Sequence, residues 1–528
     1  MIRHGTGDPE RIRIRHGAGD SEPIGRCGRE NEYRTSLRHS GTMVSLPPDA
    51  RTAIHDASLT VLSDVGMAVE HETARRVLRE AGATVDGDIV TVSPSLVTDA
   101  LDSAPATFTW HARNPDNDVT VGEGPAVVTP GTGARHVWRP DEKRRPAAMD
   151  DFETLARLAH VTDALSAVGF DLCSPEPYAL AGNPGGFEDA AVGYELLATL
   201  LRHTDEPLVG GARTAETARA SIELAAIARG EADAPSQPAV LGRVHPRSPR
   251  LWNEPLVDGL LTYARAEQPL VVSSGAIAGA SAPHSLAETV VLANAETLFG
   301  VVLTQAVSPG TPVVFGYGST AYDHEHGTVA FGDPIAGLLS GLGVAMGTHY
   351  GLPTRADGGV TDAKTVDDQA GAESMLRLAD ALRSDADVVF NAAGLLDTYD
   401  TVSPEKFVLD CERIRAVRAT DAAREALLDR LTDGSLSLDA IDAADPGEAF
   451  ADDRDLASIP DRVSFTPKLA VRGRYDDWHD GDDRTALQRA SDHVDRLLDD
   501  YDRPPLPDDV DASIRAYVDD HSSVVPET

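Results

Sequence analysis

One pattern recurs eight times along the chain: a short apolar or β-branched run followed by a helical pattern. Proline introduces several of these runs, which suits the first residue of a strand. Strands that alternate with helices predict parallel pairing through helical crossovers, so eight units predict an α/β fold, the (βα)8 or TIM barrel. The runs are Ala126–Thr129, Ala167–Leu172, Pro207–Gly210, Ala239–Val244, Leu270–Ser273, Pro312–Phe315, Pro353–Asp357 and Asp387–Asn391.

A doubly wound open sheet is the rival α/β architecture. Such sheets bind dinucleotides through a G-x-G-x-x-G turn or phosphates through a G-x-x-x-x-G-K-[ST] loop. Neither motif is present at the start of a predicted helix. The barrel is therefore the favoured interpretation.

The regions outside the predicted barrel divide the chain into four segments. Residues 1–42 carry 8 Arg and 6 Asp+Glu, unlike the acidic remainder, and we expect them to be a disordered basic arm or the product of a mis-called start, with Met43 as the true one. Residues 50–125 are expected to form an N-terminal α+β cap, with a helix over Ala53–Ala81 that stops at Gly82. The barrel should occupy residues 126–403, and a helical C-terminal extension residues 404–528, with an amphipathic helix at Asp482–Asp500.

The net charge of -38 constrains the partners, because such a field repels nucleic acid and anionic membranes. Lysine is scarce among the 47 basic residues, and this composition is typical of a protein kept soluble in concentrated salt. The longest nearly uncharged stretch, Ile335–Gly347, is too short to span a bilayer, and no signal peptide is evident. Three distant cysteines argue against a disulfide framework or a cysteine-based zinc cluster. We expect a cytoplasmic protein.

Active sites of such barrels lie at the carboxyl ends of the strands, so the residues that follow each predicted run are candidates. We interpret Asp357, Asp362 and Lys364 as catalytic. Substrate-binding candidates are Tyr317, Gln369, Asn391, Arg243 and His245. Six glycines at the same ends would let a large planar cofactor approach the backbone, although ordinary turn geometry explains each one equally well: Gly131, Gly133, Gly211, Gly275, Gly358 and Gly359.

Two motifs have competing interpretations. Asp323-His324-Glu325-His326 offers metal ligands, but no distant third ligand is evident, and we interpret it as a solvated acidic loop with no metal. The polar loop from Gly358 to Gln369 either takes part in the site or only caps the next helix through Asp367.

Several segments, in order and spacing, resemble the trimethylamine methyltransferase family. They include Pro207–Ala212, Ala293–Gln305, Pro309–Gly316, Gly358–Gly371 and Asn391–Asp397. The resemblance extends from about residue 55 to about residue 518 and implies a barrel whose mouth meets a separate corrinoid protein. It implies that a methyl group moves from a methylated amine to the cobalt of that corrinoid. The chain lacks the D-x-H-x-x-G pattern of cobalamin-binding proteins, so we expect no corrinoid bound tightly by this chain itself.

The sequence departs from the family at one important point. Trimethylamine-specific members carry pyrrolysine, whereas this chain has ordinary residues near the equivalent position, around Asp357–Asp362. Because a quaternary ammonium leaves as a neutral amine and needs no such activation, we expect a quaternary substrate such as glycine betaine, held in a dry, cation-friendly pocket. A family methyltransferase with another donor or a folate or pterin acceptor, and a non-catalytic betaine-binding barrel, remain alternatives. The oligomeric state is left open.

Overall fold

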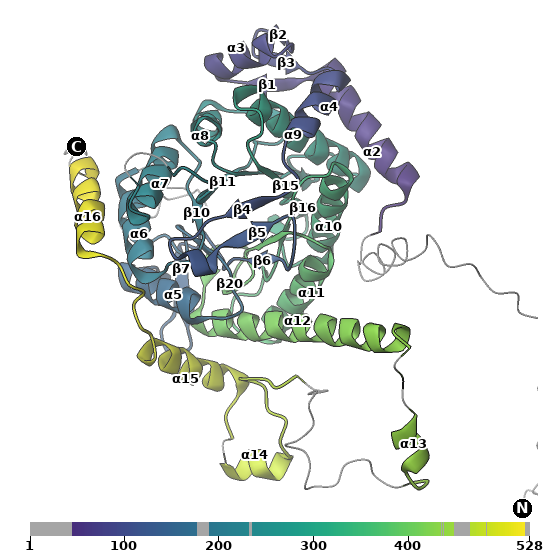
Figure 1. Cartoon of the computed structure of the whole chain (residues 1–528), viewed down its shortest axis with the longest axis vertical. Coiled ribbons are helices and arrows are strands. Elements are labelled where there is room, and N and C mark those ends of the chain that lie inside the picture. The colour runs from purple at the N-terminus through teal and green to yellow at the C-terminus, as the bar shows by residue number, and fades with distance from the viewer. Residues whose placement is uncertain are drawn as a thin grey trace, which may run out of the picture. The chain divides into compact units, whose positions relative to one another are not determined.

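The computed structural model describes residues 45–176, 190–231, 235–434, 436, 438–447, 465–481 and 483–522. The predictions made for residues 1–42 lie outside these ranges. The predicted α/β class is confirmed, because parallel strands alternate with helices along the described chain. Figure 1 shows the helices arranged around a central group of strands.

Eight short parallel strands form the centre of the molecule. They pair in two sheets, in the orders β15-β13-β11-β10-β9 and β18-β19-β6. The sheets meet at both edges: Phe315 bridges Thr354, and the Ser166 amide donates to the Val128 carbonyl at 2.9 Å. Each predicted run overlaps one of the strands, and β13 and β15 extend beyond their runs. The strands are β6 (Val127–Val128), β9 (Val168–Gly169), β10 (Leu208–Gly210), β11 (Val240–Val244), β13 (Leu270–Ser274), β15 (Val313–Tyr317), β18 (Arg355–Asp357) and β19 (Val388–Phe390).

One helix follows each of these strands on the chain. The longest of the first seven, α9 (Leu286–Val307), has buried residues around most of its circumference. By length and hydropathy it is able to cross a membrane, but 78% of its apolar window is buried inside the protein, as in the core helix of a soluble protein. The others are α5 (Met149–Val161), α6 (Ala190–His203), α7 (Ala215–Ala228), α8 (Glu254–Arg265), α10 (Pro334–His349), α11 (Asp368–Arg383) and α12 (Pro404–Thr432).

An apolar cluster fills the space between the strands. Because side chains alternate between the two faces of a strand, only one or two residues of a strand point into it. Seven of the eight strands contribute, β9 through Ala167 directly before it, and β18 contributes none. The hairpin of β4 (Phe108–Trp110) and β5 (Val119–Val121) covers the cluster at one end and is drawn across the strands in Figure 1. The buried members are Phe108, Trp110, Val121, Val127, Ala167, Val209, Leu241, Val271, Val314, Val388 and Phe390.

The N-terminal region differs from the prediction of one helix over Ala53–Ala81. The chain forms α2 (Pro48–Thr60) and a π-helical turn (Val61–Val65), then β1 (Met67–Val69) and α3 (Glu72–Glu80). Gly66 separates them with a φ of +75°, and a Cβ there would lie 2.6 Å from the Val90 carbonyl oxygen. The predicted helix is therefore wrong, because this turn requires glycine. The strand β1 joins a sheet in the order β12-β1-β3-β2, with β2 (Thr84–Asp86), β3 (Ile89–Thr91) and β12 (Leu251–Trp252), and α4 (Pro94–Ser103) follows.

The C-terminal helices pack on the outside of the molecule. The first half of α12 is buried as far as Val417 and contacts α11 and α5, so it belongs to the layer of helices around the strands. The helix α15 (Ala486–Asp499) packs on α12 and α5, and α16 (Asp508–Ser522) packs on α6 and α7 (Figure 1). Two short helices, α13 (Asp439–Ala443) and α14 (Tyr475–Gly481), lie between α12 and α15 in sequence.

The loops at the carboxyl ends of the central strands contain further short strands. They extend these loops over the ends of the central strands, where the candidate site lies. Their bounds are β7 (His136–Arg139), β8 (Lys143–Pro146), β14 (Ile277–Ala278), β16 (Thr320–Asp323), β17 (Thr328–Ala330), β20 (Leu395–Leu396) and β21 (Thr401–Val402).

Candidate active site

A cavity of about 370 Å³ opens at the carboxyl ends of the strands. All eight central strands, or the loops after them, contribute to its wall, as expected for the active-site end of such a fold. The lining residues are Thr132, Gly133, Asp171, Arg213, Arg243, His245, Gly275, Gly318, Val329, Phe331, Arg355, Asp357, Asn391, Thr398 and Tyr399.

A buried ion pair forms part of the wall. Both Arg355 and Asp357 lie on β18 two residues apart, so their side chains share one face, and only 3% and 5% of these side chains are exposed. The Arg355 guanidinium donates to both carboxylate oxygens of Asp357 and also to the Tyr317 carbonyl at 2.9 Å. Burial alone would raise the pKa of Asp357, but the charge and hydrogen bonds of Arg355 lower it below the usual value. The carboxylate is therefore ionised.

Hydrogen bonds continue from this pair across the cavity. The Asn391 side-chain amide donates to Asp357 at 2.8 Å, and its oxygen accepts from the Thr132 hydroxyl at 3.1 Å. Thr132 in turn accepts from Arg243 at 3.0 Å. Asn391 takes a left-handed backbone conformation with φ of 55°, which asparagine tolerates better than most residues. The network fixes the side chains of four strand ends, those of β6, β11, β18 and β19, relative to one another.

The cavity carries more positive than negative charge. Its arginines are Arg213, Arg243 and Arg355, and its carboxylates are Asp171 and Asp357. Burial, with the charges of Arg243 and Arg355, lowers the pKa of His245 to about 3, so this imidazole is neutral near pH 7. Three guanidinium groups against two carboxylates leave a net charge of +1.

Arginine side chains also stack on an aromatic ring at the cavity floor. The guanidinium carbons of Arg243 and Arg355 lie 5.1 and 5.3 Å from the ring centroid of Phe390. Phe390 belongs to the apolar cluster between the strands. The stacking joins the charged wall to the apolar interior and adds a cation–π contact to each arginine.

Two aromatic residues form a different part of the wall. Phe331 and Tyr399 come from separate loops, and their rings meet edge-to-face with centroids 4.8 Å apart. Tyr399 follows Asp397 and Thr398, and all three have positive φ values, of 52°, 56° and 73° in chain order. Consecutive non-glycine residues in this region are uncommon, and the surrounding contacts must hold them there.

Six of the predicted site residues line this cavity: Asp357, Asn391, Arg243, His245, Gly133 and Gly275. Their common signal was position, because each lies at or just beyond the end of a predicted strand. The same rule also applied to Thr132, Asp171 and Gly318. It missed Arg355, which lies inside a strand, and Arg213, which follows β10 by three residues. No sequence signal indicated Phe331 or Tyr399, which come from irregular loops.

Tyr317 does not face the cavity, which contradicts the prediction that it binds substrate. On β15 the neighbouring Val314 points into the apolar cluster between the strands, so Phe315 and Tyr317 point to the opposite face. There the buried Tyr317 hydroxyl donates to Asn294 of α9 at 2.8 Å. Burial raises the pKa of this phenol well above its ordinary value. Tyr317 joins a strand to a helix.

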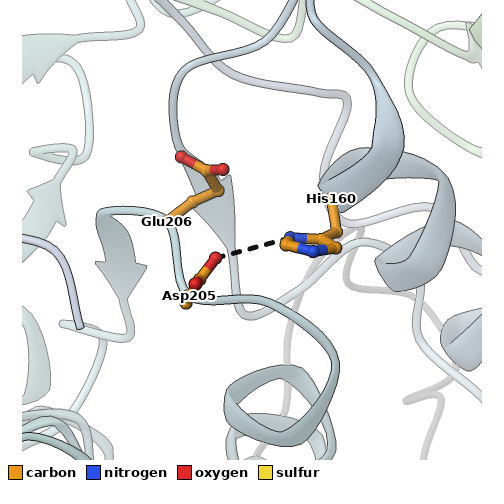
Figure 2. A group of neighbouring side chains, drawn as sticks. All are labelled: His160, Asp205 and Glu206. Carbon is orange, nitrogen blue, oxygen red and sulfur yellow. Dashed lines mark ion pairs between the residues drawn. The ribbon is translucent and has the colours of Figure 1, made fainter. Parts of the chain in front are cut away.

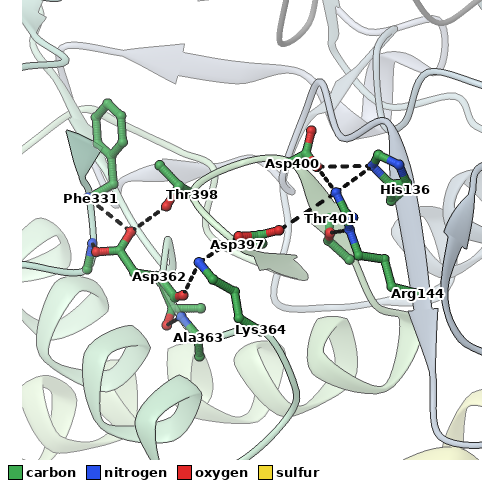
Figure 3. A network of polar contacts seen from close by, with 12 residues as sticks. His136, Arg144, Phe331, Asp362, Ala363, Lys364, Asp397, Thr398, Asp400 and Thr401 are labelled. Carbon is green, nitrogen blue, oxygen red and sulfur yellow. Dashed lines mark hydrogen bonds and ion pairs between the residues drawn. The ribbon is translucent and has the colours of Figure 1, made fainter. Parts of the chain in front are cut away.

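Asp362, Lys364 and Gln369 lie outside the cavity, in contacts between loops. The Asp362 carboxylate accepts from the amides of Phe331 and Gly332, at 3.1 and 2.9 Å, and from the Thr398 hydroxyl at 2.7 Å. Figure 3 shows these contacts beside the exposed Lys364, which lies 2.6 Å from an Asp397 oxygen. Gln369 is exposed and donates to Glu373. Asp362 thus fastens the loops that carry Phe331 and Tyr399, and the structure gives none of the three a direct place in the cavity.

The rest of the contact network in Figure 3 extends along the same rim. Arg144 of β8 contacts Asp397, Asp400, His136 and the Thr401 hydroxyl. These contacts attach the loop after β20 to the β7–β8 hairpin. The segment Asp397–Tyr399, whose backbone is left-handed, is therefore held by Asp362 on one side and by Arg144 on the other.

The remaining predicted glycines have packing roles. A Cβ at Gly131 would lie 2.8 Å from the Ala393 carbonyl, and Cβ atoms at Gly358 and Gly359 would lie 2.9 and 2.4 Å from Ala392. These three allow the strand-end loops to approach one another closely. Gly211 lines a small adjoining cavity with Arg213, Arg243 and His245, and its Cβ would lie 3.1 Å from Phe170.

Comparison with known proteins identifies the family. The model of the trimethylamine methyltransferase (MTTB) family matches residues 15–526, so the chain belongs to this family and is a methyltransferase. A glycine betaine methyltransferase of Desulfitobacterium hafniense (strain Y51) is 32% identical over 91% of this chain and 98% of its own length. The proline betaine:corrinoid methyltransferase of Eubacterium limosum is 29% identical over 72% of this chain and 79% of its own length.

More distant relatives are also found. The trimethylamine methyltransferase MttB of Desulfitobacterium hafniense (strain DSM 10664 / DCB-2) is 26% identical over 89% of this chain and 92% of its own length. Among solved structures, the monomethylamine methyltransferase MtmB of Methanosarcina barkeri covers 90% of this chain and 92% of its own, with a TM-score of 0.49 and 13% identity.

Proposed function

We propose that this protein transfers a methyl group from a carboxylated quaternary amine, of the glycine betaine kind, to the corrinoid of a partner protein. We further propose that its eight parallel strands form a (βα)8 barrel, with the cavity at the barrel mouth as the active site. The order of the strands, their contacts at both sheet edges and the helix after each strand support the barrel. The observation that carries the proposed activity is the charge of the cavity.

The surplus of one positive charge favours a ligand with a carboxylate. Asp357 is already engaged by Arg355 and Asn391, so it does not neutralise the remaining arginines. Burial lowers the pKa of Arg213, the nearby Asp171 raises it in part, and the charge of Arg243 lowers it again, so the two guanidinium groups repel each other. A substrate carboxylate between them would relieve this repulsion and accept charge-assisted hydrogen bonds.

The aromatic part of the wall suits the other end of a betaine. A quaternary ammonium has no hydrogen to donate, and proteins recognise it through aromatic faces. Phe331 and Tyr399 supply such faces, with Val329 beside them. Two known relatives are named for glycine betaine and proline betaine, which are zwitterions of this kind. The neutral His245 adds no further charge to the cavity.

The cavity itself is suited to the methyl donor rather than to a corrinoid. Its volume is near the lower end of small-molecule sites. A corrinoid would therefore meet the mouth from outside, carried by its own protein. At the mouth, Gly275 has no atom within 4 Å of an added Cβ, so the backbone there is open to a large planar group.

The chain's contribution to catalysis is orientation. The corrinoid would supply the nucleophile, and the amine would leave as a neutral tertiary amine with the electron pair of the broken carbon–nitrogen bond. No proton has to move, so the site needs no general acid or base. The arginines would hold the carboxylate, and the aromatic wall would exclude water and point one methyl group toward the mouth.

The test compares glycine betaine with choline and trimethylamine as methyl donors to cob(I)alamin, followed by absorbance. Choline keeps the trimethylammonium group and replaces the carboxylate with a hydroxyl, so it isolates the carboxylate. We expect glycine betaine to be the best donor by about tenfold or more, the size of one charge-assisted interaction. Equal rates with choline would contradict the carboxylate argument, and binding without any methyl transfer would favour the betaine-binding alternative.

A variant pair locates the effect in the cavity. Arg243→Gln should lower kcat/KM for glycine betaine by about tenfold or more and leave the poor use of choline unchanged. Arg247→Gln removes an exposed arginine just beyond β11 and should behave as the wild type. Equal activity of the two variants would show that the carboxylate binds elsewhere.

A further inference from the structure

A separate group of polar side chains lies at the amino ends of the strands, away from the cavity. His160 is in the last turn of α5, and Asp205 and Glu206 directly precede the strand β10. One possible ligand atom from each lies within 4.8 Å of the others. Figure 2 shows the His160 ring directed at Asp205, with Glu206 beside it.

We propose that His160, Asp205 and Glu206 bind a zinc ion. The His160 Nδ1 and an Asp205 oxygen are 3.5 Å apart. Two ligands on one tetrahedral zinc, with bonds of about 2.0–2.2 Å, are separated by about 3.4 Å. A direct N–H···O hydrogen bond would bring the same atoms to about 2.9 Å. The observed spacing is that of two ligands of one ion.

The Nδ1 atom of His160 is available for a ligand. It is buried and has no hydrogen-bond partner among the residues that the structure describes. A buried polar atom without a partner destabilises the protein, and coordination of an ion would remove that cost.

Among the described residues, neither carboxylate forms an ion pair with an arginine or lysine, although the charges of Arg113 and Asp205 interact. The Asn117 amide donates to both, at 3.2 Å to Asp205 and 3.3 Å to Glu206. Arg113 is close, but its guanidinium donates to the backbone oxygens of Thr204 and Pro505. The two carboxylates therefore share one amide nitrogen, and a divalent ion between them would offset their mutual repulsion.

Histidine with two carboxylates is a ligand set that zinc accepts, and a water molecule would take the fourth position. The ion would join two segments far apart in sequence, the end of α5 at His160 and the loop before β10 at Asp205 and Glu206. Tyr501 of the C-terminal region packs edge-to-face on the His160 ring, with centroids 6.0 Å apart. The site is therefore structural, and its existence does not depend on the proposed methyl transfer.

The chain offers a natural control in the acidic loop Asp323–His326. There, His326 Nδ1 lies 2.7 Å from an Asp323 oxygen, with 68% of the His326 side chain and 34% of the Asp323 side chain exposed. Such a spacing is a hydrogen bond rather than a shared ion, and an exposed pair gains little from metal binding. We therefore expect zinc to bind at the pair of His160 and Asp205 and not at the pair of His326 and Asp323.

The experiment titrates zinc into the full-length, chelator-treated protein against a fluorescent zinc indicator. Concentrated KCl and excess Mg²⁺ occupy weak sites on the acidic surface. We expect one zinc ion per chain and a rise in Tm on binding. His160→Gln and Glu206→Gln should each weaken binding by about tenfold or more, whereas His326→Gln should leave it unchanged.

Failure of the wild type to bind one zinc ion under these conditions would overturn the proposal. So would equal zinc affinity in His160→Gln, Glu206→Gln and the wild type. Circular dichroism checks that each variant is folded. If His160→Gln is not, the nearly isosteric Glu206→Gln decides, together with X-ray absorption at the zinc edge of the wild type. That spectrum must show nitrogen and oxygen ligands with at least one imidazole, and its absence would refute the site.

Discussion

The two halves of the central strands differ in character although they belong to the same strands. On β11, Leu241 packs in the apolar cluster, and two residues later Arg243 lines the cavity. On β19, Val388 lies in the cluster, and Phe390 is its last layer, beneath the arginines. Residues two positions apart on a strand point to the same face. The same row of positions therefore provides apolar packing at one end and, a few ångströms further along, the charged residues of the cavity.

This difference indicates how the charged site is supported. The ion pair of Arg355 and Asp357 is costly to bury, and the rigid layer below fixes its geometry. Substitutions in the lower half should reduce stability and leave substrate selectivity intact. Substitutions in the upper half should change catalysis, with a stability cost only where a charge loses its partner.

The largest effect should come from Asp357→Ala. It leaves the buried Arg355 without its carboxylate, which should lower the free energy of unfolding by about 3–5 kcal/mol and abolish methyl transfer. Urea denaturation measures the first effect. The double variant Arg355→Met with Asp357→Leu removes both charges and should recover most of the stability without activity. A loss below about 1 kcal/mol in the single variant would show that the pair behaves like a surface ion pair.

Leu241→Ala tests the lower half of the same region. The truncation opens a cavity in the apolar cluster and should reduce the free energy of unfolding by about 2–5 kcal/mol. The preference for glycine betaine over choline should not change. Leu427→Ala, at a position 58% exposed, serves as the control and should shift stability by less than about 0.5 kcal/mol. Altered selectivity in Leu241→Ala would mean that the two halves are not separable.

Asp362→Asn should have an intermediate effect. The amide replaces one oxygen that accepts from the loop amides, so the attachment of Phe331 and Tyr399 loosens, at a cost of about 1–2 kcal/mol. Turnover should fall by less than about tenfold, because Asp362 lies outside the cavity. Lys364→Met, at an exposed position, should change less. A complete loss of turnover in a stable Asp362→Asn protein would instead restore its predicted catalytic role.

The smallest effect concerns pH. The pKa of His245 falls from 6.5 to about 3 on folding. Between these two pH values the imidazole is therefore protonated in the unfolded chain and neutral in the folded protein. Stability should therefore be lost as pH falls below about 6.5, by less than about 1 kcal/mol between pH 7 and pH 6. Chemical denaturation of the wild type and His245→Gln at both pH values measures this contribution. An identical pH dependence in the two proteins would show that His245 is not buried in its neutral form.

Much of the fold was predictable because strand burial leaves a regular pattern. All eight predicted runs overlap a strand, and the end of the strands that carries the cavity followed from the same pattern. Alternation along β15, taken one step further, would have placed Tyr317 on the outer face with Phe315, and alternation along β18 would have placed Arg355 beside Asp357. The helix over Ala53–Ala81 failed because one glycine, Gly66, turns the chain, and a single residue outweighed the helical periodicity around it.

The loops were the part that sequence patterns could not place. Asp362 and Lys364 were expected in the site because they follow a strand, but the loop directs them to the rim instead. Phe331 and Tyr399 reach the cavity through irregular segments whose course depends on tertiary contacts. The proposed zinc site could not be predicted from the sequence either, because its three ligands come from two distant segments with no recurring spacing.

The left-handed run Asp397–Tyr399 has a consequence for attempts to make this protein more robust. Thr398 is a β-branched residue with φ of 56°, a conformation that glycine or asparagine adopts at lower cost. A screen for heat resistance would therefore select replacements at this position. The same replacements would remove the hydroxyl that binds Asp362 and free the neighbouring Tyr399. Replacements of Thr398 would therefore raise heat resistance and lower turnover at the same time.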